Sequence, residues 1–146
     1  MTQPLALSGL EVAQGNLNGN YLTGNEWSTV LWTSDLGPCV AICGYNGDTA
    51  FLIHSDSTRA SGIGATDLAS GLQALIPGIG VDSGYALTLI GGSTAGTAAY
   101  LREHLAEAEI VDGGWADSAY ITGDGRVAPT KRKLAEALGA ESITIV

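Results

Sequence analysis

The stretch TSDLGPCVAICGYNGDTAFLIH, residues 33–54, decides the fold of this chain. Residues 39–45 (CVAICGY) and 49–54 (TAFLIH) are short apolar runs of a composition that favours β-strands. Between them, Asn46-Gly47 supplies the positive φ values of a type I′ turn, which joins two antiparallel strands. The two runs are therefore predicted to pair as one hairpin, whose open end brings residue 39 close to residue 54.

Outward from this hairpin, short apolar runs alternate with turns. Residues 1–26 are polar and rich in Gly and Asn, which is typical of short strands and turns. A loop is expected at 55–65, and then a short helix that Thr66 or Asp67 caps and that ends near Ile76. Further strands are expected at 29–33, 85–90, 109–112, 119–122, 126–128 and 142–146, and further helices at 94–108 and 130–138. Strands outnumber helices, which predicts an α/β sandwich with antiparallel hairpins rather than an alternating βαβ fold.

Length and charge narrow the functions that are open to the chain. Its 146 residues fit a single domain, 1–146. The net charge is −9, and the only cluster of basic residues is Lys131-Arg132-Lys133, so no nucleic-acid partner is expected. The apolar runs fall far short of the roughly 18 residues of a membrane span, and the N-terminus lacks the pattern of a secretory signal. A cytoplasmic protein is the default expectation, although an effector exported by another route would look the same.

The chain has two cysteines, Cys39 and Cys43, on one predicted strand. Four residues of strand separate their side chains by about 13 Å, at roughly 3.3 Å per residue, which is too far for a disulfide. No second pair of ligands accompanies them, so no zinc site is expected. Two free thiols suit a reducing compartment.

A nucleophilic cysteine needs a base, and the base needs a third group to orient it. The chain has two histidines. His104 falls in a predicted helix beside Glu103 and is interpreted as a surface residue, whereas His54 ends the strand that pairs with the strand of Cys39. The hairpin geometry therefore allows a contact between Cys39 and His54, although the residue pattern by itself favours the alternative. The alternative is that both cysteines are small buried hydrophobic residues, which is the commoner fate of a free cysteine.

The segment from Thr33 to Tyr45 resembles the signature of the CheD family of chemoreceptor glutamine deamidases. That family has a Thr, then LGSC, then a CVAVC-x-Y strand and, after a short loop, a His. Here Thr33 lies six residues before Cys39, and His54 lies 15 residues after it. The cytotoxic necrotizing factor deamidase toxins share the same Cys/His core. Fainter similarities follow in LIGGS (89–93), IVDGG (110–114) and ITGDGRV (121–127), so the resemblance extends over about two thirds of the chain.

This resemblance implies a function and a site. Cys39 would be the nucleophile, His54 its base and Thr33 the group that orients the imidazole. The reaction would convert a glutamine side chain of a partner protein to glutamate, without a cofactor or a metal. The fold would be a layered α-β-β sandwich of mixed and antiparallel strands with flanking helices.

Some residues depart from the family pattern. Pro38 stands where the family has Ser, and proline has no N–H, so the donors to a developing oxyanion are expected to be the Cys39 N–H and a second group that the sequence leaves open, with the Gly37 N–H as one candidate. After His54 the chain reads SDST rather than FMLP, so the substrate can differ while the chemistry is shared. Two other functions stay open: a non-catalytic binding or regulatory module with Cys39 buried, and another amide or peptide hydrolase with the same dyad.

Two further groups of residues have an ordinary structural interpretation. The stretch GGSTAGT (91–97) lies between a predicted strand and a predicted helix, and a tight turn is expected there rather than a phosphate-binding loop. The three tryptophans, Trp27, Trp32 and Trp115, are expected to be core residues or to line a site.

Overall fold

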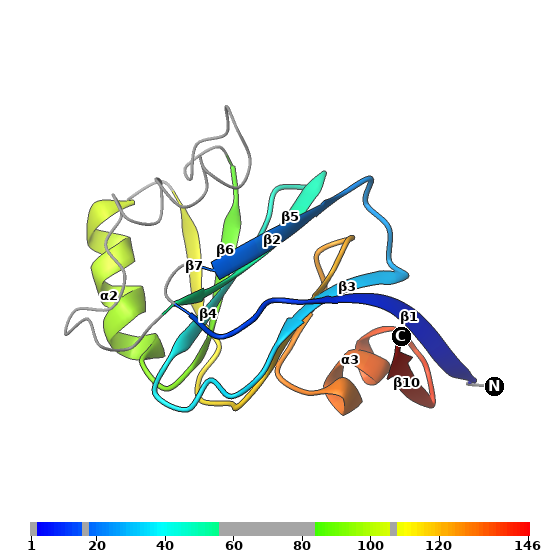
Figure 1. Ribbon diagram of the computed structural model, residues 1–146. Coiled ribbons are helices and arrows are strands. Elements are labelled where there is room, and N and C mark those ends of the chain that lie inside the picture. The colour runs from blue at the N-terminus through cyan, green and yellow to red at the C-terminus, as the bar shows by residue number, and fades with distance from the viewer. Residues whose placement is uncertain (1–2, 16–17, 56–83, 106–107) are drawn as a thin grey trace.

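The computed structural model describes residues 3–15, 18–55, 84–105 and 108–146 (Figure 1). Over these residues the protein is mostly β, with two five-stranded mixed sheets, one of them curled into a half-barrel, and two short helices. The strands are β1 (Pro4–Glu11), β2 (Asn18–Thr23), β3 (Thr29–Thr33), β4 (Val40–Tyr45), β5 (Thr49–Ser55), β6 (Ala86–Gly91), β7 (Glu109–Asp112), β8 (Ala119–Thr122), β9 (Val127–Ala128) and β10 (Ser142–Ile145). The helices are α2 (Thr94–His104) and α3 (Lys131–Ala137).

The predicted hairpin is confirmed. Strands β4 and β5 pair antiparallel, from Val40 opposite Ser55 to Tyr45 opposite Ala50. The predicted turn type is wrong, because only Gly47 has a positive φ, of +96°, which matches the first central position of a type II′ turn. The Asn46 side chain instead accepts hydrogen bonds from the N–H groups of the two residues after Gly47, at 3.0 and 2.8 Å.

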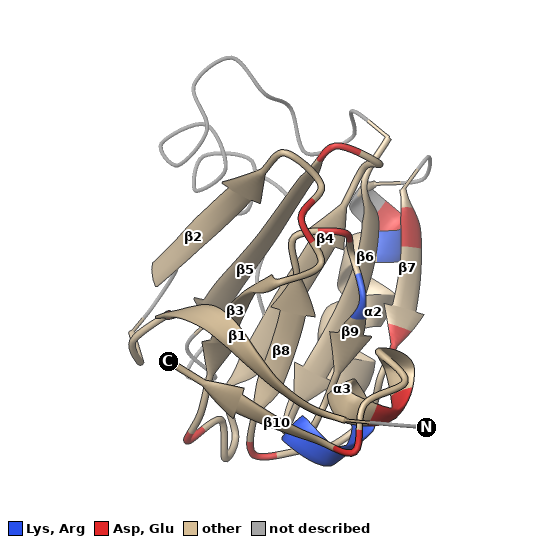
Figure 2. Cartoon of the chain, turned by 90° about the vertical axis from the view of Figure 1, so that its right-hand side faces the viewer, with Lys and Arg blue, Asp and Glu red and all other residues tan. Residues whose placement is uncertain are grey.

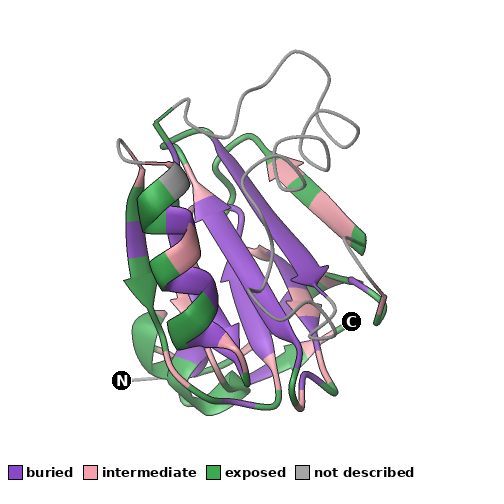
Figure 3. Ribbon diagram, turned by 90° about the vertical axis from the view of Figure 1, so that its left-hand side faces the viewer, coloured by how far each residue is buried: buried purple, intermediate pink, exposed green. Residues whose placement is uncertain are grey.

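The first sheet has the strand order β2-β5-β4-β6-β7. One of its faces packs against α2 through an apolar cluster that includes Val40, Ile53, Leu89 and Leu101. Figure 3 shows the buried strands of this sheet beneath the helix. The helix begins at Thr94, as predicted, and ends at His104, earlier than the expected residue 108.

The second sheet has the strand order β10-β1-β3-β8-β9, and α3 packs on its outer face. The α3 helix begins after Thr130, whose side chain accepts a hydrogen bond from the Lys133 N–H at 3.0 Å, as an N-cap residue does. It ends before Gly139, whose φ of +69° is easily adopted by glycine. The predicted helix and closing strand at the end of the chain are confirmed.

The two sheets face each other across a second apolar cluster. The first sheet contributes alternate residues of β4 and β5, and the second contributes Leu31 of β3 and Ile121 of β8. Every residue of β5 is buried, because α2 and its neighbouring cluster cover one face and the second sheet covers the other. This interior between the sheets holds the residues of the predicted site.

The expected α/β class is too helical for the described residues, since the two helices have only 11 and 7 residues. The mixed sheets and hairpins are as expected. The helix predicted near residues 66–76 lies outside the described residues. Within the part of the chain that is described, no helix has the length and apolar character needed to cross a membrane.

Candidate active site

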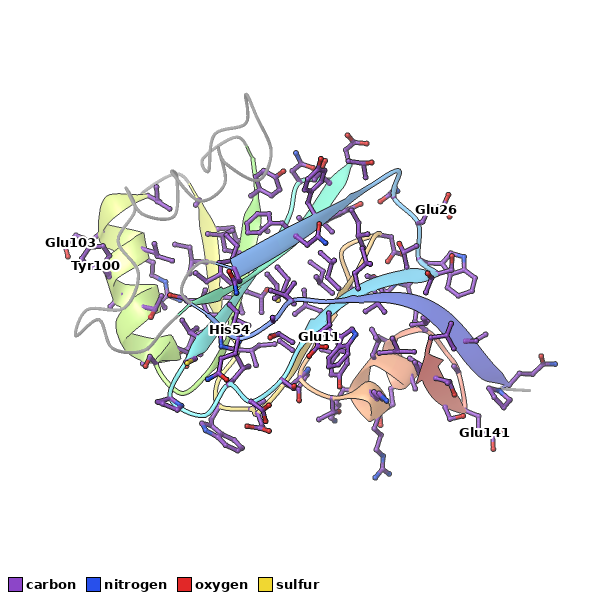
Figure 4. All side chains as sticks on the ribbon, viewed as in Figure 1. Glu11, Glu26, His54, Tyr100, Glu103 and Glu141 are labelled. Atoms are coloured by element: carbon purple, nitrogen blue, oxygen red, sulfur yellow. The ribbon has the colours of Figure 1, made fainter. Side chains whose placement is uncertain are left out.

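Thr33 and His54 meet between the two sheets. Thr33 is the last residue of β3, and His54 lies in β5, opposite Ala41 of β4 and Asn18 of β2. The Thr33 Oγ1 atom lies 2.8 Å from His54 Nδ1, and both side chains are fully buried. Figure 4 shows the His54 side chain in the middle of the molecule. The resemblance predicted this pairing of Thr33 and His54, and the geometry brings the two residues together.

The direction of these hydrogen bonds fixes the tautomer of His54. The Thr33 hydroxyl donates its one hydrogen to the backbone carbonyl of Val12, at 2.7 Å. The hydroxyl oxygen therefore accepts from the Nδ1–H of His54. In the neutral imidazole, the lone pair then lies on Nε2. His54 is held in the one tautomer whose outer nitrogen can take a proton from a nucleophile.

Cys39 lies at the same end of the hairpin as His54. Ala41 is directly opposite His54, and Cys39 precedes Ala41 by two residues, which places it on the same face of the sheet. A hydrogen bond of 2.9 Å from the Gly92 N–H to the Cys39 carbonyl extends β4 toward its N-terminus. Diagonal neighbours of this kind are about 7–8 Å apart, within reach of long and aromatic side chains. The Cys39 side chain lies in the interior cluster between the sheets and is 7% exposed.

The loop before Cys39 is held tightly. Leu36 is fully buried, and its N–H donates to the carbonyl of Asp117 at 3.0 Å. Asp35 and Gly37 both have positive φ, of +55° and +46°. The Cys39 N–H donates to the Leu36 carbonyl at 2.5 Å, which closes a turn over Gly37 and Pro38. The expectation that the Cys39 N–H is available to an oxyanion is therefore wrong for this conformation, because a carbonyl already accepts from it.

The two glycines of the LIGGS stretch are required by the backbone of Cys39. A Cβ on Gly91 would lie 2.2 Å from the Cys39 carbonyl oxygen, and a Cβ on Gly92 would lie 2.6 Å from the Pro38 Cα. The Ser93 hydroxyl donates to the Pro38 carbonyl at 2.8 Å. The strand-to-helix turn expected here is confirmed, and it places the first turn of α2 beside Cys39. The positive end of a helix favours a negative charge, such as that of a thiolate.

The other cysteine and the other histidine do not belong to the arrangement of Cys39, Thr33 and His54. Cys43 is 1% exposed in the same interior, and burial raises the pKa of its thiol to about 12. It is therefore a neutral thiol near pH 7, as its predicted burial implies. His104 ends α2, the helix that packs on the face of the first sheet that points away from the interior cluster.

The Val12 carbonyl is the part of the site that sequence reasoning missed. Val12 follows β1, and its side chain gives no sign that its backbone oxygen will meet Thr33. A pairing of β1 with β3 would have been the only signal, since it places the end of one strand next to the end of the other. Among the described residues, no group of three or more His, Cys, Asp or Glu side chains could hold a metal ion.

No protein-family model matches this chain, and no curated protein matches it.

Proposed function

We propose that this protein is a cysteine-dependent amidohydrolase that converts a glutamine side chain of a partner protein to glutamate. The observation that carries this function is the chain of hydrogen bonds from His54 Nδ1–H to Thr33 and on to the Val12 carbonyl. It leaves Nε2 as the basic nitrogen of a histidine that shares a sheet face with Cys39. The resemblance to the CheD family supports the same three residues, in the same order along the chain.

The reaction follows from these positions. His54 Nε2 takes the proton of the Cys39 thiol, and the thiolate attacks the carboxamide carbon of the glutamine. The carbon–nitrogen bond then breaks, and the proton on Nε2 leaves with the amine as ammonia. Water loses a proton to Nε2 and attacks the resulting thioester, which releases glutamate and restores the thiol. Thr33 keeps the imidazole in one orientation and one tautomer throughout.

The backbone around Cys39 bears on how the thiol and an oxyanion would be stabilised. The Ser93 hydroxyl holds the Pro38 carbonyl, and this contact fixes the backbone directly before Cys39. For the Cys39 N–H to stabilise an oxyanion, its hydrogen bond to the Leu36 carbonyl must break when substrate binds. The thiols are free and two in number, so we place the protein in a reducing compartment such as the cytoplasm, where it needs no cofactor.

The layered arrangement of the chain fits the same proposal. A helix covers one face of the first sheet, and the second sheet covers the other, as in the α-β-β sandwich that the resemblance implies. In this arrangement the hairpin of β4 and β5 is central, and its open end is where the two sheets and the start of α2 converge.

A second function is favoured by one observation. Cys39 is 7% exposed, and its N–H is already bonded, which suits a buried hydrophobic residue of a non-catalytic binding module. Such a module would show no thiol-dependent turnover. A peptidase that uses the same dyad would cleave the chain of its substrate rather than release ammonia.

The test is mass spectrometry of candidate proteins after incubation with this protein, combined with an assay for ammonia. We expect conversion of glutamine to glutamate, loss of this conversion in Cys39→Ser, and its retention in Cys43→Ser as the matched control. Cleaved chains without free ammonia would indicate a peptidase. Equal activity of the wild type and Cys39→Ser would contradict any role for the thiol.

A further inference from the structure

Trp115, expected to be a core residue or to line a site, lies on the surface and is not part of the core. Its side chain is 72% exposed, compared with 46% for Trp27. It follows Gly113 and Gly114, which connect β7 to the segment before β8. A tryptophan that is so exposed leaves a large apolar area in water, which is typical of a residue that a partner covers.

The backbone fixes Trp115 beside the proposed nucleophile. The Gly91 N–H donates to the Gly114 carbonyl at 3.1 Å, and Gly91 itself lies against the Cys39 carbonyl. On the other side of Trp115, Ala116 packs in the same interior cluster as Cys39. Thus the residues on both sides of Trp115 are held against the immediate neighbours of Cys39, and its own side chain is turned outward.

Three exposed aspartates lie on the segments that hold Trp115, and Arg102 of α2 approaches β7 through a 3.0 Å hydrogen bond to the Ile110 carbonyl. Asp112 and Asp117 lie on the same segment, and Asp35 lies in the loop whose next residue, Leu36, bonds to the Asp117 carbonyl. None of the three forms a salt bridge within the described part of the chain. The ion pairs there are Arg126–Asp124 and Lys133–Glu136. In Figure 2, the Lys and Arg residues of α3 are the blue part of that helix.

We propose that Trp115, with Asp35, Asp112 and Asp117, docks a segment of the substrate protein in which Lys or Arg residues flank the target glutamine. This inference rests on the proposed deamidase function and names its substrate class. A Lys or Arg side chain can stack on the indole face of Trp115 while its charge lies near the carboxylates. The carboxylates also attract a basic segment and repel an acidic one, which contributes to selection of the substrate. The glutamine between the basic residues is thereby presented to Cys39.

The test separates docking from chemistry. Binding of two fluorescein-labelled peptides to the Cys39→Ala protein is measured by anisotropy at low and high salt. One peptide has its glutamine between lysine and arginine, and the other has it between two glutamates. We expect the basic peptide to bind at least about tenfold more tightly, with the difference lost at high salt. Equal binding of the two peptides, or binding of neither, would overturn the proposal.

Variants assign the binding to this surface. Trp115→Ala should weaken binding of the basic peptide by about tenfold, whereas Trp27→Ala, which removes an exposed indole elsewhere, should not. The Asp112→Asn/Asp117→Asn double variant should remove most of the charge preference, and the Glu26→Gln/Glu141→Gln double variant, which removes two exposed charges elsewhere, is the matched control. Since all of these side chains are exposed, the fold should be retained, and a melting curve checks this. Unchanged binding in Trp115→Ala would overturn the proposal.

Turnover of the same peptides by the wild type distinguishes the two proposals. If ammonia is released equally from both peptides, the deamidase function stands and the docking surface is wrong. If the basic peptide binds through Trp115 but no ammonia is released, the docking surface stands and the deamidase function is wrong.

Discussion

The two ends of the β4–β5 hairpin contain the two cysteines in different surroundings. Cys39 and Cys43 lie on the same face of the same strand, and both are nearly inaccessible to water. At the open end, Cys39 shares its sheet face with His54, whose Nδ1 is bonded to Thr33, and Ser93 before α2 bonds to the Pro38 carbonyl. Toward the turn, Cys43 is opposite Leu52, and burial raises the pKa of its thiol to about 12. Under the proposed function, the neighbours of each buried thiol, rather than its burial, distinguish the nucleophile from the inert thiol.

Near the turn, side chains pack closely on the face of the hairpin that α2 covers. A Cβ on Gly44 would lie 2.1 Å from the Phe51 ring, and Phe51 in turn packs edge-on against Tyr85, with ring centroids 5.0 Å apart. At the open end, the interior is instead bordered by turns and by the carbonyl groups of Val12 and Leu36, which accept hydrogen bonds.

The largest expected difference concerns the two histidines. We expect His54→Ala to lower turnover by about 10³-fold or more, because it removes the base that activates Cys39. His104→Ala should stay close to the wild type, since His104 ends the helix on the other face of the sheet. Ammonia release by both variants measures this. A dead His104→Ala enzyme would show that the base has been assigned to the wrong histidine.

The next prediction compares the two thiols directly. Iodoacetamide should label Cys39 at least about 100-fold faster than Cys43 near neutral pH, because a thiolate paired with an imidazolium reacts quickly and a desolvated neutral thiol does not. Limited labelling of the native protein, followed by peptide mapping, gives the ratio. In His54→Ala, labelling of Cys39 should slow toward that of Cys43. Faster labelling of Cys43 in the native protein would reverse the comparison.

A smaller effect is expected at Thr33, which acts through His54. Thr33→Ala should lower turnover by about 10- to 100-fold and leave the thiol in place, because a residue that orients the base contributes less than the base itself. Thr33→Ser keeps the hydroxyl and should keep much of the rate, whereas Thr33→Val keeps the shape and should lose it. Turnover and melting curves of the three variants are compared. A fully active Thr33→Val enzyme would show that Thr33 is a packing residue only.

The hairpin could be predicted from the sequence because its causes are local. The apolar runs and Asn46-Gly47 specify two short strands and a turn over a few residues. Counting residues back from the turn along both strands then gives the residues at the open end. The turn type could not be predicted in this way, because Asn46 can either adopt a positive φ or bond to the following backbone with its side chain. Local preference does not decide between these two, whereas the surrounding packing does.

The site could be predicted only in part, because its remaining contacts are long-range. Thr33 and His54 come together only when the second sheet packs on the first, and the resemblance, not the residue pattern, pointed to that pair. Val12 and Trp115 lie far from Cys39 in the sequence, and no local pattern marks their places. The engaged Cys39 N–H likewise depends on a turn over Gly37 and Pro38 that a strand-and-turn analysis does not specify.

The smallest expected effect is a dependence of stability on pH that comes from Cys43. Burial raises its pKa from 9.0 to about 12, so the folded protein keeps this thiol protonated at pH values where the unfolded chain ionises it. The unfolded state then binds fewer protons, and the free energy of unfolding falls as pH rises from about 9 toward 12. Between pH 8 and pH 10 the loss should be about 1.4 kcal/mol, with no contribution at lower pH.

Urea unfolding of the wild type and Cys43→Ala at these two pH values measures that loss. Cys43→Ala should have a smaller decrease in unfolding free energy from pH 8 to pH 10, although its stability at pH 8 is itself lower because a buried group has been removed. Tyr85 and Tyr120, whose pKa values burial also raises, contribute to both proteins and cancel in the difference. Cys39→Ala, assayed in parallel, shows what the thiol at the open end adds. If the wild type and Cys43→Ala lose stability equally between the two pH values, Cys43 is more solvated than its burial indicates, and the contrast between the two ends of the hairpin is smaller than proposed.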